Sequence, residues 1–340
     1  MKYTNKKIYR KKRRRKLKLF LFIGVFLFAL GLGGYYFLSN QSEIMDYETA
    51  RYSTSIEPKS LLIDELCVAS DDISSESFST EEEFHAIALF QLNEQRVLHA
   101  EHIHERIYPA STTKIMTAYL ALKYGELTDV VTISENAVGV PLDSSRAGFK
   151  AGDQVTLDVL LYSLMLPSGN DSAVAVAEHI SGSIEEFAKL MNSEAKKIGA
   201  TNSNFVTPHG YHDENHYTTA YDLYLIFNEC VKYEKFLDIV SSAEFTTEVQ
   251  QANGTYRNVT WKQSNQFVNG IIEIPDGVTV VGGKTGTTNE AGSCLILYSN
   301  INDSSEDKTS PYISIIMGAE TKPILYKNMS NLISSVSIYE

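Results

Sequence analysis

Strand-like and helix-like hydrophobic patterns occupy different parts of this chain. Short apolar runs, rich in Val, Ile, Leu and Phe, predict strands at residues 86–90, 96–98, 278–288, 293–299 and 312–319. Asn93 and Glu94 favour a hairpin between the first two strands. The third strand runs into a glycine-rich bend, and a polar loop at 300–310 joins the last two.

Apolar residues at helical spacing fill the middle of the chain and recur near its end. They predict helices at residues 111–124, 156–167, 172–180, 184–198, 218–231 and 323–336. The first helix is apolar nearly all round, so we expect it to be central and buried. Residues 144–153 form a loop, and we expect Asn170 or Asp171 to cap the third helix.

A different pattern precedes these elements. Residues 19–38 are 20 consecutive uncharged positions, and as a helix they span about 30 Å, enough to cross a bilayer. Residues 1–18 hold 11 Lys and Arg and no acid, which orients the N-terminus toward the cytoplasm and the remainder outside. A cleaved signal peptide is the alternative, but its apolar region is usually shorter and no Ala-x-Ala site follows. We therefore expect an uncleaved single-pass anchor.

Composition extends this division of the chain. Residues 39–83 hold 12 acidic side chains against Arg51 and Lys59, a balance typical of a linker. We expect a basic cytoplasmic segment at 1–18, a transmembrane anchor at 19–38, an acidic Ser-rich linker at 39–83 and one folded domain at 84–340. The net charge is −12, and without the 11 basic residues of 1–18 it is −23, which argues against nucleic acid as a partner.

Three cysteines are few for an exported chain, and their number is odd. Cys67 falls in the predicted linker and Cys294 in an apolar strand, while Cys230 lies at the end of a predicted helix. They do not form a disulfide framework.

Ser111 and Lys114 lie three residues apart at the start of the predicted central helix, so their Cβ atoms are about 5–6 Å apart on one face. Pro109 suits the residue before a helix, and the first turn favours a developing negative charge at Ser111. A lysine kept neutral by burial or by a nearby cation can take the serine's proton. The motif indicates a nucleophilic serine with a lysine base, although an N-capping serine beside a surface lysine is left open.

Two more short motifs follow, Ser-Gly-Asn at 168–170 and Lys-Thr-Gly at 284–286. Turn chemistry explains the Asn but gives no reason for an exposed serine before it. The second motif is not a phosphate loop, because Gly282 lies two residues before the lysine and a strand follows. The histidines within 209–216 have loop-like spacing, so we expect neither a metal nor a cofactor.

The three motifs occur once each and in this order, and together they resemble the penicillin-binding D-alanyl-D-alanine carboxypeptidases of the low-molecular-weight class, the S11 serine peptidases. Residues 164–173 and 209–223 extend the match, which covers roughly residues 84–337. The resemblance implies the α+β transpeptidase-like fold of the serine β-lactamases and D,D-peptidases. In that fold a mixed, mainly antiparallel five-stranded sheet is flanked by helices, and the site lies between the sheet edge and a helical lobe.

The resemblance also implies the catalytic roles. Ser111 attacks the carbonyl between two terminal D-alanines through an acyl-enzyme, and Lys114 accepts its proton. Ser168 relays the proton to the leaving D-alanine, and Lys284 keeps the local field positive. The side chain of Asn170 orients the substrate amide. The implied partners are a peptidoglycan stem peptide ending in D-Ala-D-Ala and β-lactams as covalent inhibitors.

Substrate binding is where the chain departs from the family pattern. The resemblance assigns the terminal carboxylate to Thr285 and Thr287, and the oxyanion hole to the backbone N–H groups of Ser111 and Thr287. Members often add an arginine after the Lys-Thr-Gly strand. Here Lys322 is the only cation within 318–323, and Glu320 opposes it. Many members also end in a β-rich domain and an amphipathic anchor, which we expect the N-terminal helix to replace.

Two other functions fit the same fold. A β-lactamase commonly needs a Glu-x-x-Leu-Asn loop between the second and third motifs, and none occurs between Asn170 and Lys284. A catalytically idle wall-binding domain is disfavoured by the intact motif residues. We therefore expect a serine D,D-carboxypeptidase in the cell membrane, with its catalytic domain outside the cell.

Overall fold

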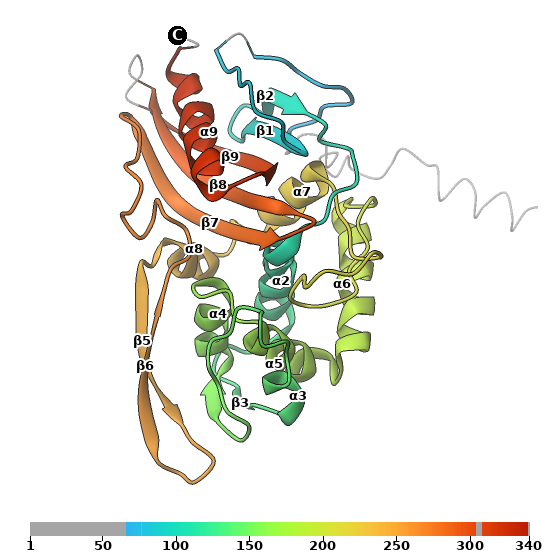
Figure 1. Ribbon diagram of the computed structural model, residues 1–340, viewed down its shortest axis with the longest axis vertical. Helices are drawn as coiled ribbons and strands as arrows, with labels where there is room; N and C mark the ends of the chain where they lie inside the picture. The colour runs from blue at the N-terminus through green and yellow to red at the C-terminus, as the bar shows by residue number, and fades with distance from the viewer. Residues whose placement is uncertain (1–65, 76, 304–307, 339–340) are drawn as a thin grey trace, which may run out of the picture. The chain divides into compact units, whose positions relative to one another are not determined.

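Five strands form the larger sheet of this protein (Figure 1). The structure is a computed structural model that describes residues 66–75, 77–303 and 308–338, which belong to one folded unit. The strands are β1 (Ala86–Gln91), β2 (Arg96–Glu101), β7 (Val278–Thr288), β8 (Gly292–Asp303) and β9 (Lys308–Ala319), in the order β2-β1-β9-β8-β7. Every neighbouring pair is antiparallel, so the expectation of a mixed sheet is wrong. Chain neighbours joined by hairpins must run antiparallel, and β9 meets β1 in the same sense.

The last three strands are longer than their hydrophobic runs. β7 continues through Lys-Thr-Gly to Thr288 without the predicted bend, because its ladder with β8 pairs Lys284 with Ile296 and Gly286 with Cys294. β8 and β9 likewise extend into the predicted polar loop at 300–310. The third motif is therefore held in the edge strand of the sheet, just after a break in the ladder between Val280 and Gly282.

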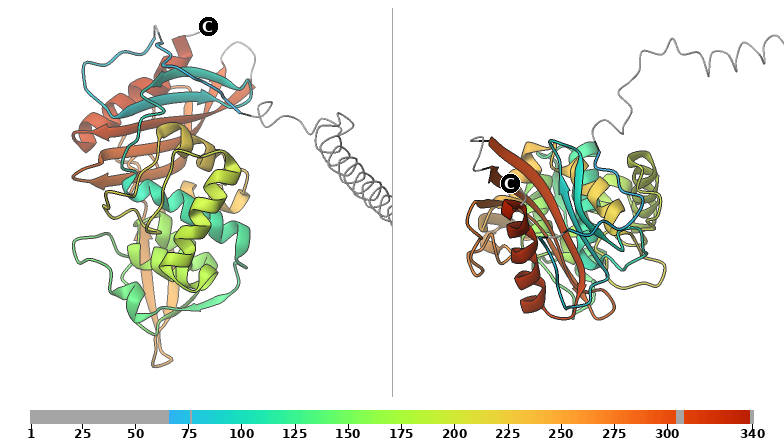
Figure 2. Two further views of the ribbon diagram at one scale, coloured as in Figure 1. Left: turned by 90° about the vertical axis from the view of Figure 1, so that its right-hand side faces the viewer. Right: turned by 90° about the horizontal axis from the view of Figure 1, so that it is seen from above.

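Both faces of the sheet are covered, and β1 shows how. All six of its residues are buried. Phe90 points to the helical lobe, where its ring stacks on Tyr224 at 4.1 Å, whereas Ile87 and Leu89 belong to a second core. This second core packs against α9 (Lys322–Ser334), which lies on the opposite face of the sheet from the lobe (Figure 2). A short 3-10 turn, Ser335–Ile338, follows α9.

The helical lobe is built around one central helix. Its helices are α2 (Lys114–Tyr124), α3 (Glu135–Val138), α4 (Leu157–Met165), α5 (Asn170–Ser181), α6 (Ile184–Ile198), α7 (Ala220–Cys230) and α8 (Glu234–Ser241). The first eight residues of α2 are all buried, which confirms the predicted central helix. The predicted helices of α4 to α7 and of α9 are confirmed to within two residues at each end.

A smaller sheet was not predicted. It consists of β3 (Val130–Thr132), β4 (Gln154–Thr156), β5 (Glu244–Gln250) and β6 (Tyr256–Lys262), in that spatial order. β5 and β6 pair over their whole length and form a long hairpin that extends beside the lobe (Figure 1). α8, which precedes this hairpin, was not predicted either.

The folded part begins before the predicted boundary at residue 84. Cys67 is fully buried; its N–H donates to Tyr224 Oη at 2.8 Å and its Sγ lies 3.3 Å from the Gln91 carbonyl. Ile73 pairs with Ala100 beside β2. These few apolar residues dock on the domain despite the acidic composition around them.

The predicted anchor at 19–38 lies outside the described residues, as do residues 1–18 and 39–65. None of the helices in the described part has the length and apolar character needed to cross a bilayer.

Candidate active site

A 3-10 turn, Ala110–Thr113, leads into α2 and carries Ser111. The carbonyl of Pro109 accepts hydrogen bonds from the N–H and the Oγ1 of Thr112, at 3.1 and 2.6 Å. Thr113 Oγ1 donates to the first carbonyl of the turn at 2.8 Å. Two buried threonine hydroxyls thus donate to carbonyl oxygens at the start of the turn, and the Ser111 side chain is half-buried at its surface.

Lys114 occupies the position that the motif predicts. Its Nζ lies 2.9 Å from Ser111 Oγ, 2.7 Å from Asn170 Oδ1 and 3.0 Å from the carbonyl oxygen of His209. The last two partners can only accept hydrogen bonds. A neutral amine has two N–H groups for these two acceptors, and its lone pair is then directed at the Ser111 hydroxyl.

The surroundings of Lys114 favour that neutral state. The side chain is fully buried, and burial is the main cause that lowers its pKa well below the ordinary value. The charge of Lys284 lowers the pKa further, and Asp171 opposes both effects. A buried amine of this kind can act as a general base toward Ser111.

Ser168 and Lys284 form a second hydroxyl–amine pair. Lys284 Nζ donates to Ser168 Oγ and to the carbonyl of Thr285, both at 2.9 Å. Burial lowers the pKa of Lys284 from 10.5 to about 7. Ser168 itself has φ +62, a left-handed conformation that is uncommon outside glycine. Ser168 is buried rather than exposed, and its hydroxyl, bonded to Lys284, is the reason for the serine before Asn170 that turn chemistry left unexplained.

Asn170 and Asp171 begin α5, but neither is its cap. The N-cap is Gly169, without a side-chain hydrogen bond, so the predicted capping role is wrong. Asn170 instead accepts from Lys114, and its N–H donates to the Ser145 carbonyl at 2.9 Å. The carboxylate of Asp171 accepts three backbone N–H groups from residues 147–149, at 2.8 to 3.2 Å. These bonds fasten the preceding loop beside the site.

Strand β7 lies directly against the turn that carries Ser111. A Cβ at Gly286 would sit 3.1 Å from both the Pro109 carbonyl oxygen and the Ser111 nitrogen. Thr285 Oγ1 hydrogen-bonds to Ser264 Oγ at 2.8 Å. The small residue of Lys-Thr-Gly therefore permits the close approach that places the edge of the sheet beside the nucleophile.

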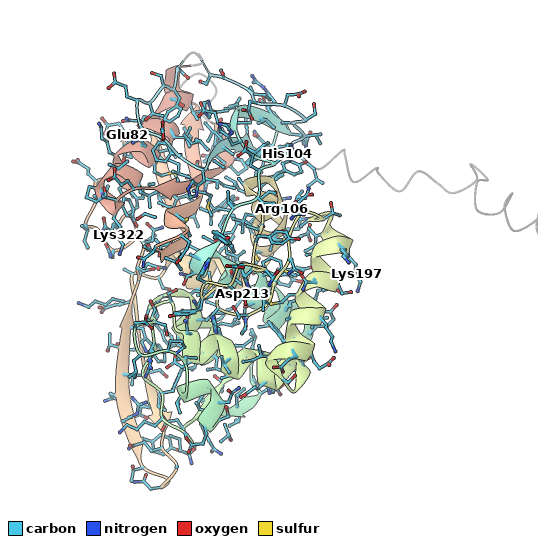
Figure 3. All side chains as sticks on the ribbon, turned by 45° about the vertical axis from the view of Figure 1, so that its right-hand side comes forward. Glu82, His104, Arg106, Lys197, Asp213 and Lys322 are labelled. Carbon is cyan, nitrogen blue, oxygen red and sulfur yellow. The ribbon has the colours of Figure 1, made fainter. Side chains whose placement is uncertain are left out.

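Two cavities meet at the nucleophile, and Ser111, Ser145 and Thr287 line both. The smaller cavity, about 140 Å³, adds Ser168, Thr285 and Lys322. No carboxylate occurs among the described residues that line it. Figure 3 labels Lys322, which begins α9 at the edge of the sheet nearest the lobe.

Several residues at the site carry no signature in the sequence. Ser145 and Ser264 act as single loop residues, and His209 contributes only its carbonyl. His216 Nε2 lies 2.9 Å from Thr113 Oγ1 and thereby supports the 3-10 turn that carries Ser111. The resemblance to the family, which extends over residues 209–223, was the signal in the sequence that pointed to this loop.

The histidines of 209–216 do not form a metal site. Burial, then the charges of Lys114 and His216, lower the pKa of His209 to about 3, and burial lowers that of His216 to about 4. The backbone N–H of Val206 donates to His216 Nδ1 at 3.0 Å. Within the described residues there is no cluster of His, Cys, Asp and Glu that could hold a metal ion.

The chain was compared with known families and proteins. The family described as D-alanyl-D-alanine carboxypeptidase, peptidase S11, matches residues 75–321. D-alanyl-D-alanine carboxypeptidase DacF of Bacillus subtilis is 35% identical over 243 residues, which are 68% of this chain and 57% of that protein. DacC of Escherichia coli K12, of the same name, is 34% identical over 250 residues, 70% of this chain and 57% of that protein. The chain thus spans little more than half the length of these relatives.

Solved structures share the fold. The Streptomyces K15 DD-transpeptidase superposes with a TM-score of 0.67 at 26% identity, covering 76% of this chain and 98% of the other. Penicillin binding protein 5 from Haemophilus influenzae gives a TM-score of 0.63 at 31% identity, covering 77% of this chain and 71% of the other. With most of its length matched in this way, the chain belongs to the S11 peptidases, the family of the D-alanyl-D-alanine carboxypeptidases.

Proposed function

We propose that this protein is a serine D,D-carboxypeptidase that removes the terminal D-alanine from peptidoglycan pentapeptide stems. The observation that carries the proposal is the pair of buried amines, Lys114 and Lys284, each 2.9 Å from the hydroxyl of a serine that lines the same cavity. The pair of Ser111 and Lys114 suits the attack on the peptide, and the pair of Ser168 and Lys284 suits the departure of the amine. The names of the curated relatives, D-alanyl-D-alanine carboxypeptidases, support this activity, and the DD-transpeptidase neighbours fit a penicillin-binding serine enzyme.

Acylation follows from these two pairs. Ser111 Oγ attacks the carbonyl carbon between the two D-alanines while its proton passes to Lys114 Nζ. The backbone N–H groups of Ser111 and Thr287 hold the oxyanion, each contributing about 3 kcal/mol. The C–N bond then breaks as the proton held by Lys114 passes through the Ser168 hydroxyl to the departing nitrogen, which leaves Lys114 neutral again while Lys284 keeps its hydrogen bond to Ser168. Free D-alanine leaves, and the rest of the peptide is an ester on Ser111.

Hydrolysis of that ester restores the enzyme. A water molecule gives its proton to Lys114 and its oxygen attacks the ester carbonyl. The Ser111–acyl bond breaks, and Lys114 returns that proton to Ser111 Oγ. Asn170, 2.7 Å from Lys114, holds the amine in place through both steps and orients the substrate amide.

The smaller cavity suits the terminal carboxylate of the substrate. Thr285 and Thr287 offer hydroxyl groups there, and Lys322 supplies a positive charge. Lys322 thus replaces the arginine that many members carry. Because no carboxylate lines this cavity among the described residues, a free C-terminus meets no like charge there.

We also propose that residues 19–38 anchor the protein in the cell membrane, with residues 1–18 in the cytoplasm and the catalytic domain outside. The 20 uncharged residues and the 11 preceding cations support this topology. The substrate, a cell-wall peptide, is outside the cell as well.

The activity is tested with penicillin, whose strained amide reacts like the D-alanyl-D-alanine bond. We expect a covalent adduct on the peptide that contains Ser111, stable for minutes or longer, since the smaller cavity offers no carboxylate to activate water. Mass spectrometry of the full-length protein and of Ser111→Ala measures it. Rapid turnover of penicillin without an adduct identifies a β-lactamase instead, and no reaction at all identifies an idle domain.

A further inference from the structure

The larger of the two cavities, about 430 Å³, is not used by the chemistry described so far. Ser111, Asn170 and Thr287 line its inner end. The leaving D-alanine occupies the smaller cavity, where Ser168 gives up its proton and Lys322 meets the carboxylate. The two parts of the substrate on either side of the scissile bond lie on opposite sides of Ser111. The larger cavity therefore receives the acyl side, meaning the residues that precede the two D-alanines.

The outer end of this cavity is acidic. Asp143, from the loop before β4, and Glu290, from the turn between β7 and β8, are exposed carboxylates that line it together with Tyr211 and His212. No lysine or arginine occurs among its described lining residues. The Tyr211 hydroxyl donates to both oxygens of Asp143 at 3.3 and 3.4 Å, and His212 Nδ1 lies 3.7 Å from Glu290 Oε2.

The charges of both carboxylates, Asp143 and Glu290, are felt at the Tyr211 hydroxyl. Its pKa is raised by the charge of Asp143 first, then by burial and by their hydrogen bond, and also by the charge of Glu290. A phenol whose ionisation is opposed by both groups lies in the negative potential of both. The same potential attracts a cation.

We infer that the larger cavity binds a side-chain ammonium group on the acyl side of the substrate, and that Asp143 and Glu290 determine this specificity. The inference rests on the proposed function. A lysine-like residue before the two D-alanines brings a side-chain amine that is positively charged until it is acylated. The enzyme therefore prefers stems that are not yet cross-linked through that amine.

The test compares two peptides that differ in one charge. Nα-acetyl-L-lysyl-D-alanyl-D-alanine has a free ε-ammonium, and its Nε-acetyl derivative has none. We expect the full-length protein to release D-alanine from the charged peptide with a kcat/KM about 5- to 20-fold higher, as two partly exposed ion pairs allow. The preference declines as salt is raised from about 0.05 to 0.5 M.

Variants assign the preference to the cavity. Asp143→Asn and Glu290→Gln each reduce the ratio of the two rates, and the double variant brings it close to one. Glu248→Gln is the matched control, because it removes one exposed carboxylate from β5 that does not line the cavity, and it keeps the ratio. A ratio near one in the unaltered protein, or a ratio that survives in the double variant, overturns the inference.

A third peptide distinguishes the two natural sources of the amine, lysine and diaminopimelate, which carries a carboxylate beside the amine. We expect the diaminopimelyl peptide to react more slowly than the lysyl peptide, since Asp143 and Glu290 repel its carboxylate. A faster reaction overturns the inference. Failure of the proposed function looks different: no peptide releases D-alanine, and penicillin leaves Ser111 unmodified.

Discussion

At the scale of single residues, the site contains two fully buried lysines without a carboxylate partner in the described part of the chain. Lys114 and Lys284 donate only to hydroxyl, amide and carbonyl oxygens. An unpaired ammonium is expensive to bury, and both amines reduce that cost by losing their protons more easily. The property that makes them useful for proton transfer therefore opposes folding.

Lys284→Met tests this opposition. The folded-state pKa of Lys284 is about 7 and its ordinary value is 10.5, so between these pH values the unfolded chain binds more protons. Raising the pH from 7 to 9 should then stabilise the native protein by roughly 2 kcal/mol through this residue alone. Methionine has no proton to lose, and the variant should lack this increment while losing activity.

Urea unfolding at pH 7 and pH 9 measures the difference. Lys327→Met is the control, because Lys327 is an exposed lysine of the same type on α9, and its replacement should leave the pH dependence of stability unchanged. An identical pH dependence in the native protein and Lys284→Met would show that Lys284 has an ordinary pKa.

The residues at the site divide by how far the sequence could identify them. Ser111 and Lys114 lie three apart on a helix, so their contact follows from helical geometry. Ser168 meets Lys284 only because a loop and an edge strand pack together, and only the resemblance to a family indicated that. Ser145 and His216 act through single contacts within loops, for which no spacing rule exists.

At the scale of elements, burial decided what could be predicted. β1 is buried throughout and so are the first eight residues of α2, so their apolar runs were visible in the sequence. β5 and β6 each have a single buried residue, Val249 and Trp261, and their other positions alternate only between exposed and half-buried, a pattern too polar to predict a strand. Their stability comes from pairing with each other, which one sequence does not display.

The loop before α7 controls the nucleophile turn through one glycine. Gly210 has φ +76, and a Cβ there would overlap the Ala110 carbonyl oxygen and Thr113 Oγ1. Gly210→Ala should therefore displace the turn and slow penicillin acylation at least tenfold, about 1.4 kcal/mol. Gly270→Ala is closely matched, because Gly270 has the same φ and nothing within 4 Å of its added Cβ.

Stopped-flow acylation and thermal unfolding separate the two effects of this substitution. Both variants carry the backbone strain of a left-handed alanine, roughly 1–2 kcal/mol. Only Gly210→Ala should lose acylation rate. Equal rates in the two variants would mean that the turn tolerates displacement by the loop.

At the scale of the whole molecule, the protein comprises a described catalytic unit and the N-terminal residues that precede it. The hydrophobic pattern predicted most elements of that unit, but it gave no order for the strands in the sheet, because pairing between β1 and β9 spans almost the entire unit. The predicted start of the folded unit, residue 84, is too late, because the apolar side chains of Cys67, Ala69 and Phe78 are already buried against it.

The anchor is testable on the full-length protein. We expect it to sediment with membranes and to resist extraction by high salt or carbonate, because 20 uncharged residues partition into the bilayer irrespective of ionic strength. Deletion of residues 1–38 should release a soluble protein that still reacts with penicillin. A mature N-terminus beyond residue 38, found by sequencing, would instead establish a cleaved signal peptide.

The pairing of the first strand with the last also governs when the enzyme becomes active during its synthesis. Ala88 of β1 is paired with Ile315 of β9, and Lys284 lies on β7, which is held by β8 and through it by β9. At roughly 5–20 residues per second, the ribosome delivers the last strand about 10–45 s after the first. The nucleophile and its base emerge early, within the helical lobe, but their partner lysine has no finished sheet to hold it. We therefore expect a nascent chain not to react with penicillin until β9 has been synthesised.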